Sequence, residues 1–179
     1  NPDVSEHQPT GDFRRLMQAE LAELDTRFAP NELAFLALTS KVELPIRDRL
    51  AFVLSTRLKD SLLVAREWRS VDLAVLSRDV PGSPRMLLEV KSWYTFDLVG
   101  RSVVRVVQMA RNDRAKLLGL PGLPAAAQLF VLVLATHPLS AITPDLAQIT
   151  KYGSGISAAI TRLRTADEGR ETGERQPCV

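Results

Sequence analysis

Three strand-like runs follow one another closely in the middle of the chain, at residues 62–68, 71–77 and 86–94. The first link has only two residues, and the second contains Pro81-Gly82, a pair typical of a type II turn. Links this short join neighbouring strands that run in opposite directions, because a parallel connection needs a dozen or more residues. The sequence therefore predicts an antiparallel meander of three strands.

Apolar residues at helical spacing flank this meander on both sides. Residues 40–58 carry such a stripe before it, and residues 99–118 carry another after it. The expected buried side of the second helix consists of Val103, Val106, Val107, Ala110 and Leu117. The next run, 128–135, is almost entirely apolar, as expected of a strand that is buried on both faces and follows a crossover helix. A last helical stretch is expected within 144–163, interrupted at Gly153 and Gly155. The expected fold class is α/β, with a mixed central sheet flanked by helices.

The two ends of the chain differ in composition from this core. After a polar opening stretch, helical spacing recurs over residues 12–28 and again over 32–39. Three parts are therefore expected: a flexible lead with a helical extension (1–39), the core (40–164) and a charged, disordered tail (165–179).

Charge and cysteine content exclude several classes of protein. The net charge of +2, from 23 basic and 21 acidic residues, is too small to establish a nucleic-acid partner. Most of the basic residues are Arg, however, which suits bidentate contacts with phosphate. The one cysteine, Cys178, excludes a disulfide framework and a Cys-rich zinc site, so a reducing, cytoplasmic location is expected. No run approaches the ~18 apolar residues of a membrane span, so no membrane partner is expected.

Charged residues interrupt two of the three strand runs. Asp72 lies in the second run, and Glu89 and Lys91 lie two residues apart in the third. Side chains alternate between the two faces of a strand, so Glu89 and Lys91 share one face and Val90 points to the other. Charges within an apolar strand are costly unless they pair, bind a metal or take part in chemistry.

This arrangement resembles the PD-(D/E)xK nuclease superfamily, which contains restriction endonucleases and RecB-like domains. The resemblance covers residues 40–136: a helix, the meander with its acid and its E-x-K, a second helix and a strand. Val71 stands where the motif name has proline, and Gln108 is followed by Asn112 where RecB-like members carry tyrosine. The resemblance implies a restriction-endonuclease-like core and an endonuclease that hydrolyses DNA phosphodiester bonds with a metal ion, with RNA not excluded as substrate.

The resemblance assigns a role to each matching residue. Asp72 and Glu89 match the metal-binding acids, Lys91 matches the lysine, and Glu43 matches an acid that many members carry on the preceding helix. Carboxylate oxygens are hard ligands suited to Mg²⁺, or to Mn²⁺ as a substitute, and the backbone carbonyl of Val90 could be a third ligand. Lys91 would orient the attacking water or stabilise the developing charge.

Two of these assignments compete with a purely structural interpretation. Glu89 and Lys91 could belong to a cross-strand salt bridge on a solvated face of the sheet. Ser40 and Glu43 also match the S-x-x-E capping box, in which the Glu43 carboxylate only accepts a hydrogen bond from a backbone N–H of its own helix start.

Other charged residues also have both a functional and a structural interpretation. Asp113 and Lys116 resemble a D-x-x-K-L signature of several family members, but in the simpler interpretation they form an i,i+3 pair on a helix surface. Glu67 is expected in a salt bridge or facing solvent. Arg47 is expected off the buried stripe of its helix.

Two other functions remain open on the sequence alone. The chain could be a non-catalytic nucleic-acid-binding or assembly protein that retains the nuclease scaffold, or a metal-dependent phosphatase or nucleotidase that acts on small molecules. A core motif does not encode substrate specificity. A homodimer is the expected assembly for cutting both strands, with the N-terminal helices as a two-fold interface.

Overall fold

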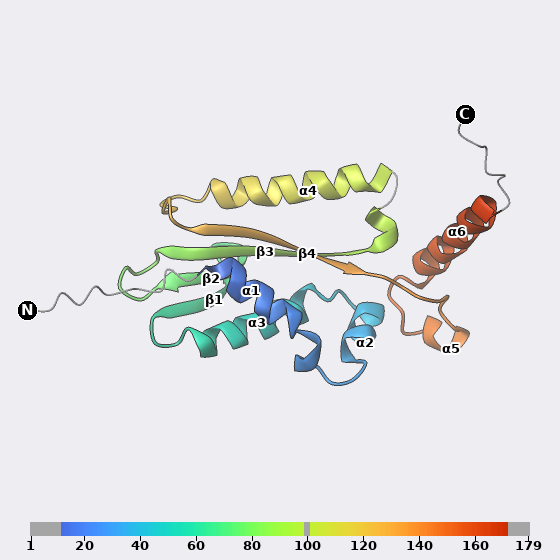
Figure 1. Ribbon diagram of the computed structural model, residues 1–179, viewed down its shortest axis with the longest axis horizontal. Helices are drawn as coiled ribbons and strands as arrows, with labels where there is room; N and C mark the ends of the chain where they lie inside the picture. Colours follow the sequence, from blue (N-terminus) through green and yellow to red (C-terminus); the bar gives the residue numbers. More distant parts are fainter. Residues whose placement is uncertain (1–11, 99–100, 172–179) are drawn as a thin grey trace, which may run out of the picture.

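A computed structural model describes residues 12–98 and 101–171 of the chain. The structure is α/β, and a four-stranded mixed sheet of order β1-β2-β3-β4 lies between helices (Figure 1). In chain order the elements are α1 (Phe13–Ala22), the 3-10 helix η1 (Asp25–Arg27), α2 (Glu32–Thr39), α3 (Glu43–Arg57), β1 (Leu62–Trp68), β2 (Val71–Ser77), β3 (Pro84–Tyr94), the 3-10 helix η2 (Thr95–Leu98), α4 (Arg101–Leu118), β4 (Gln128–Thr136), α5 (Pro144–Ala147) and α6 (Gly153–Glu171).

The antiparallel meander predicted from the sequence is confirmed. β1 pairs with β2, and β2 with β3, in antiparallel register. The turn before β3 has the type II form: Ser83 donates its N–H to the carbonyl of Val80 at 3.0 Å, and Gly82 adopts a φ of 74°. As predicted, β4 runs parallel to β3 after the helical crossover α4.

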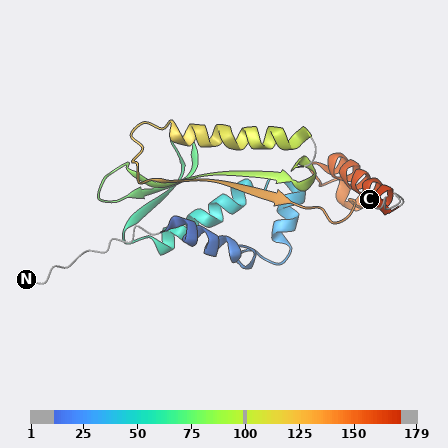
Figure 2. The same cartoon turned by 45° about the horizontal axis from the view of Figure 1, so that its top comes forward.

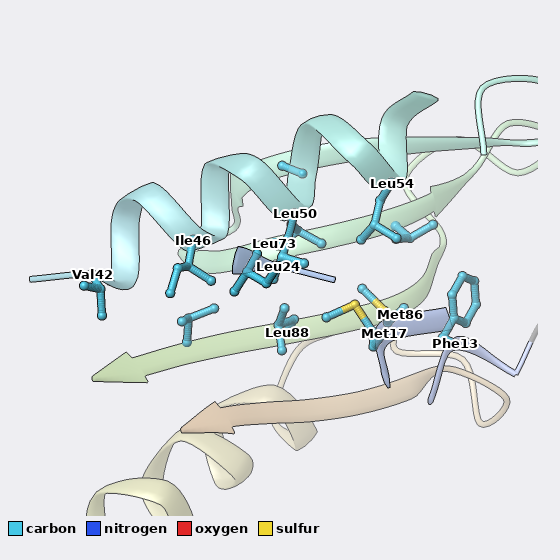
Figure 3. Close-up of a cluster of buried hydrophobic side chains, with 13 residues drawn as sticks. Phe13, Met17, Leu24, Val42, Ile46, Leu50, Leu54, Leu73, Met86 and Leu88 are labelled. Carbon is cyan, nitrogen blue, oxygen red and sulfur yellow. The ribbon is translucent and has the colours of Figure 1, made fainter. Parts of the chain in front are cut away.

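The sheet buries one apolar core on each face. α1, α2 and α3 lie on one side of the sheet, and α4 lies along the other (Figures 1 and 2). Figure 3 shows Ile46, Leu50 and Leu54 of α3 beside Leu73 and Leu88 of the sheet. The core on the α4 side is made of Val71, Ala74, Leu76, Leu87 and Leu117. The middle parts of β2 and β3 are therefore covered on both faces, and Glu89, a charged residue of β3, is buried there.

The N-terminal helices differ in part from the prediction. The helix over 32–39 is confirmed, whereas the helix expected over 12–28 ends at Ala22. Thr26 explains the early end: its N–H binds the Asp25 carboxylate and its hydroxyl binds the Glu23 carbonyl, and such local bonds compete with a helix. The apolar face of α1 is buried in the core through Phe13 and Met17, so that face is not free for an interface between copies.

The expected burial of β4 on both faces is wrong. In the sheet described here β4 is an edge strand, and its Val133 remains 40% exposed. The burial expected for the 99–118 helix is also wrong in its first half, because Val103 and Val107 are exposed while Leu117 is fully buried. Only the end of α4 that bears Leu117 joins the core of the central strands.

The C-terminal helical stretch is interrupted before Gly153, close to the predicted position, but not at Gly155. A short helix, α5, ends at Ala147, and α6 begins at Gly153 and continues to Glu171. α6 therefore enters the segment expected to be a disordered tail, and residues 172–179 lie outside the described part, as does the lead over residues 1–11. Among the described residues, no helix combines the length and the apolar character that a membrane crossing requires.

Candidate active site

The candidate site lies where β2 and β3 part. Their ladder ends at the pair Leu73 and Leu88, but β3 continues to Tyr94. Beyond that pair, the edge of β3 that faced β2 offers backbone N–H groups to other partners. The Asp72 carboxylate accepts the N–H of Val90 at 2.8 Å, and the Glu43 carboxylate accepts the N–H of Ser92 at 2.6 Å. Two acids far apart in the sequence thus replace the missing strand as acceptors.

The position of Glu43 decides between its two interpretations. The capping-box interpretation is wrong, because the Ser40 hydroxyl donates to the carbonyl of Leu36 and the Glu43 carboxylate reaches across to β3. α3 begins at Glu43, after residues 40–42 of the expected helix. The acid is therefore held at the same strand edge as Asp72.

Arg47 lies on the same face of α3 as Glu43, because residues four apart in a helix are neighbours. The prediction that it lies off the buried stripe is wrong, since only 6% of it is exposed. Its guanidinium lies 2.8 Å from Asp48, 3.0 Å from Glu67 and 4.0 Å from Asp72. Burial opposes its charge, but hydrogen bonds to Asp48 and Glu67 outweigh that effect and raise the pKa of Arg47. Glu67, exposed and ion-paired, is as predicted.

Glu89 is the most deeply buried acid of the site, with 2% of its surface exposed. One carboxylate oxygen lies 2.7 Å from Nζ of Lys116, and the other lies 3.5 Å from Nζ of Lys91. Burial raises the pKa of the Glu89 carboxyl, and the negative charge of Asp72 adds to the rise against the opposing effect of the two lysines. Burial thus makes ionisation of the Glu89 carboxyl costly, and the two lysines offset part of that cost.

Lys91 faces the same side of β3 as Glu89, as the alternation predicted. Its Nζ also lies 3.8 Å from the Asp113 carboxylate on α4. Burial disfavours the charged form of Lys91, but four surrounding carboxylates, led by Asp113 and Glu89, outweigh it and raise the pKa of the ammonium group. Lys91 is therefore a cation at neutral pH. Glu89 and Lys91 do form an ion pair, as the structural interpretation expected, but Glu89 is buried, so the pair does not lie on a solvated face of the sheet.

Asp113 and Lys116 extend the site beyond the predicted residues. The interpretation as a pair on the helix surface is wrong: each contacts β3, and Lys116 also donates to the backbone carbonyl of Ser70 in the β1–β2 link. Oδ2 of Asp113 is buried and finds no hydrogen-bond partner in the described part of the chain. The D-x-x-K spacing was the sequence signal for both residues.

The oxygen donors at this site fit a small hard cation. Asp72 and Glu89 are near enough for the charge of one to raise the pKa of the other. The carbonyl of Val90 points to the same edge as its N–H, because a strand residue presents both groups to one neighbour. Mg²⁺ needs only one or two carboxylates, since it keeps several waters. Among the described residues, no cluster of three or more His, Cys, Asp or Glu side chains is placed to bind a metal. The donors of Asp72, Glu89 and Val90 are carboxylate and carbonyl oxygens, the ligand types that suit Mg²⁺ better than a soft metal.

Comparison of the chain with known proteins adds no assignment to this geometry. No protein-family model, no curated protein and no solved structure matches it. The site must therefore be interpreted from its own residues.

Proposed function

We propose that this chain is a metal-dependent nuclease with a restriction-endonuclease-like core of the PD-(D/E)xK type, and that it hydrolyses DNA phosphodiester bonds. The observation that carries the proposal is the meeting of Asp72, Glu89 and Lys91 at the point where β2 leaves β3. Buried charges with shifted pKa values in one place are typical of functional sites, because a fold gains little from keeping them.

Each residue has a distinct role in the proposed reaction. The carboxylates of Asp72 and Glu89, with the carbonyl of Val90, would hold Mg²⁺. The bound ion would supply charge neutralisation at the phosphate and an acidified water. Lys91 remains protonated, so it would donate hydrogen bonds to a phosphate oxygen or to the attacking water, and it would not accept the proton. Glu43, fixed on the same strand edge, would act from the outer side of the site.

Lys91→Ala is expected to lower cutting of DNA by about 100-fold, because one preorganised charge at the phosphate is lost. The measurement incubates supercoiled plasmid and single-stranded DNA with the protein in Mg²⁺ or in EDTA. EDTA should abolish cutting by the wild type. Lys59→Ala, which removes an exposed lysine outside the cluster, is the matched control and should cut normally.

The result that would overturn the proposal is equally direct. Mg²⁺-dependent cutting that survives unchanged in Lys91→Ala would place the chemistry elsewhere. A circular dichroism spectrum of each variant separates loss of chemistry from loss of fold, and Lys91 is partly exposed, so its truncation should leave the fold intact.

A second function is favoured by one specific observation. Both oxygens of Glu89 already lie beside lysine ammonium groups, and Asp72 and Glu43 each accept a backbone N–H. Acids that have structural partners can belong to a scaffold kept for binding nucleic acid or for assembly, without catalysis. In that case Lys91 and Lys116 neutralise the Glu89 carboxylate, as a bound metal ion would in the nuclease.

Titration calorimetry with Mn²⁺ and Mg²⁺ separates these two functions. The nuclease is expected to bind Mn²⁺ at one site, and Asp72→Asn should weaken this binding at least tenfold, because a charged ligand becomes neutral. Glu67→Gln, which removes an exposed acid that pairs with Arg47 and is not one of the proposed metal ligands, should bind Mn²⁺ like the wild type. The absence of binding heat in the wild type would favour the scaffold function.

A further inference from the structure

A cavity lies beside the carboxylate and lysine cluster, at the end of β3. It has a volume of about 480 Å³ and shares Glu43 and Lys91 with the cluster. Ser40 and Lys41 contribute to its wall from the link between α2 and α3, and Met109 does so from α4. The volume falls within the roughly 300–1,000 Å³ of small-ligand sites. The cavity therefore has room for a planar ring system directly next to the cluster.

Aromatic side chains form much of the remaining wall. Tyr94 and Phe96 stack with ring centroids 5.1 Å apart and planes within 3°, and Tyr152 meets Tyr94 edge-on at 6.0 Å. The hydroxyl of Tyr94 donates to the carbonyl of Ala37 at 2.7 Å, which fixes the ring against α2. Trp93 also lines the cavity. The ring of Tyr94 is held in place by these contacts before any ligand arrives, so ordering it on binding costs little entropy.

Two chemical features of the cavity together define its occupant. Aromatic walls bind flat unsaturated rings by stacking, and every nucleobase has such a face. The ammonium of Lys91 at the cluster side attracts an anion, so a ring that carries a phosphate fits better than an uncharged ring. A saturated apolar ligand would satisfy the walls but would make no use of the charge of Lys91.

We propose that this cavity receives one unpaired nucleobase of the strand whose phosphodiester lies at the cluster. The proposal rests on the nuclease function and specifies its substrate class. A base inside a duplex is stacked and paired, so it can enter the cavity only after it leaves the helix. The substrate is therefore single-stranded or locally unpaired nucleic acid.

The test measures binding without metal, so it does not depend on cutting. Fluorescence anisotropy in EDTA at fixed ionic strength compares a labelled oligothymidine with an abasic strand of equal phosphate number and with a matched duplex. The wild type should prefer oligothymidine over the abasic strand by roughly 5- to 150-fold, the range expected from stacking one base on aromatic rings. Binding of the duplex should be weaker than that of the single strand.

Three variants locate the preference at the cavity. Tyr152→Ala should remove most of it, and Tyr152→Phe should keep it because the ring remains. Tyr152 is 37% exposed, so its truncation should not unfold the chain. Phe52→Ala removes an exposed ring of α3 that does not line the cavity and should bind like the wild type. Equal affinity of the wild type for the thymidine and abasic strands, or an unchanged preference in Tyr152→Ala, would overturn the proposal.

A failure of the base-pocket proposal can be told apart from a failure of the nuclease proposal, because the same protein preparations can also be assayed for cutting. Plasmid or single-strand cutting without a base preference would refute the base pocket and leave the nuclease standing. A base preference that depends on Tyr152, in a protein that never cuts, would refute the nuclease and leave a single-strand binding site. Equal binding of duplex and single strand would refute the substrate class.

Discussion

Glu89→Gln is expected to lower Mg²⁺-dependent cutting by roughly 1,000-fold and to leave the metal-free protein at least as stable as the wild type at neutral pH. The amide has nearly the shape of the carboxyl, so the packing of β3 is kept. It lacks the negative charge that would hold a metal ion. Loss of activity without loss of stability would mark Glu89 as a residue kept for chemistry.

The stability half of this prediction follows from the burial of Glu89. Burial raises the pKa of its carboxyl in the folded chain, and Asp72 adds to the rise. Lys116 and Lys91 oppose it, but the net direction is upward, so the fold favours the protonated form. A neutral side chain of the same shape removes the cost of burying the charge. Lys91 keeps Asp113 as a partner, and Lys116 is 40% exposed, so neither lysine is left buried without solvation.

The raised pKa of Glu89 also predicts how the stability difference between Glu89→Gln and the wild type changes with pH. A carboxyl with a raised folded pKa binds its proton more tightly in the folded than in the unfolded chain. Its contribution to stability is therefore complete below the ordinary value of 4.5 and is lost as the pH rises through the raised pKa. Gln does not titrate. The unfolding midpoint of Glu89→Gln relative to the wild type should thus increase from pH 4 towards pH 7.

Thermal unfolding of both proteins in EDTA, across that pH range, checks the sign. Glu23→Gln is the matched control, because Glu23 is an exposed acid of α1's end that pairs with Arg27 away from the site. Glu23→Gln should cut DNA at the rate of the wild type. A Glu89→Gln protein that is much less stable than the wild type at pH 7 would mean that the two lysines stabilise the fold through Glu89, which would favour the scaffold function.

The strand part of the site could be predicted from the sequence because it depends on local rules. Short links enforce the meander, and the two-residue alternation places Glu89 and Lys91 on one face and Val90 on the other. Asp72 meets them because β2 and β3 are neighbours in that meander. None of these steps requires knowledge of how a helix packs on the sheet.

The helical part of the site could not be predicted in the same way. The contacts of Lys116 with Glu89 and of Arg47 with Glu67 depend on where α4 and α3 cross the sheet. Helical periodicity gives a buried face but not its position along a strand. The same reason explains why the burial predicted for Val103 is wrong: its periodicity is helical, but it is 39% exposed.

Leu50→Ala is expected to destabilise the chain by about 2–5 kcal/mol, the range for removing a buried leucine from a packed core. Leu50 is 1% exposed and belongs to the core between α3 and the sheet (Figure 3). For a chain of this size the unfolding midpoint should fall by roughly 2–4 °C for each kcal/mol. Thermal or urea unfolding measures the change.

Phe52→Ala on the same helix is the matched control for Leu50→Ala. It deletes a larger side chain, but Phe52 is 68% exposed, so the free energy of unfolding should change by less than about 0.5 kcal/mol. Equal losses in the two variants would mean that α3 does not present this face to the sheet. The orientation matters for the site because residues 43, 47 and 50 recur at helical spacing. The packing of Leu50 thus fixes the helix face from which Glu43 reaches Ser92 and Arg47 approaches Asp72.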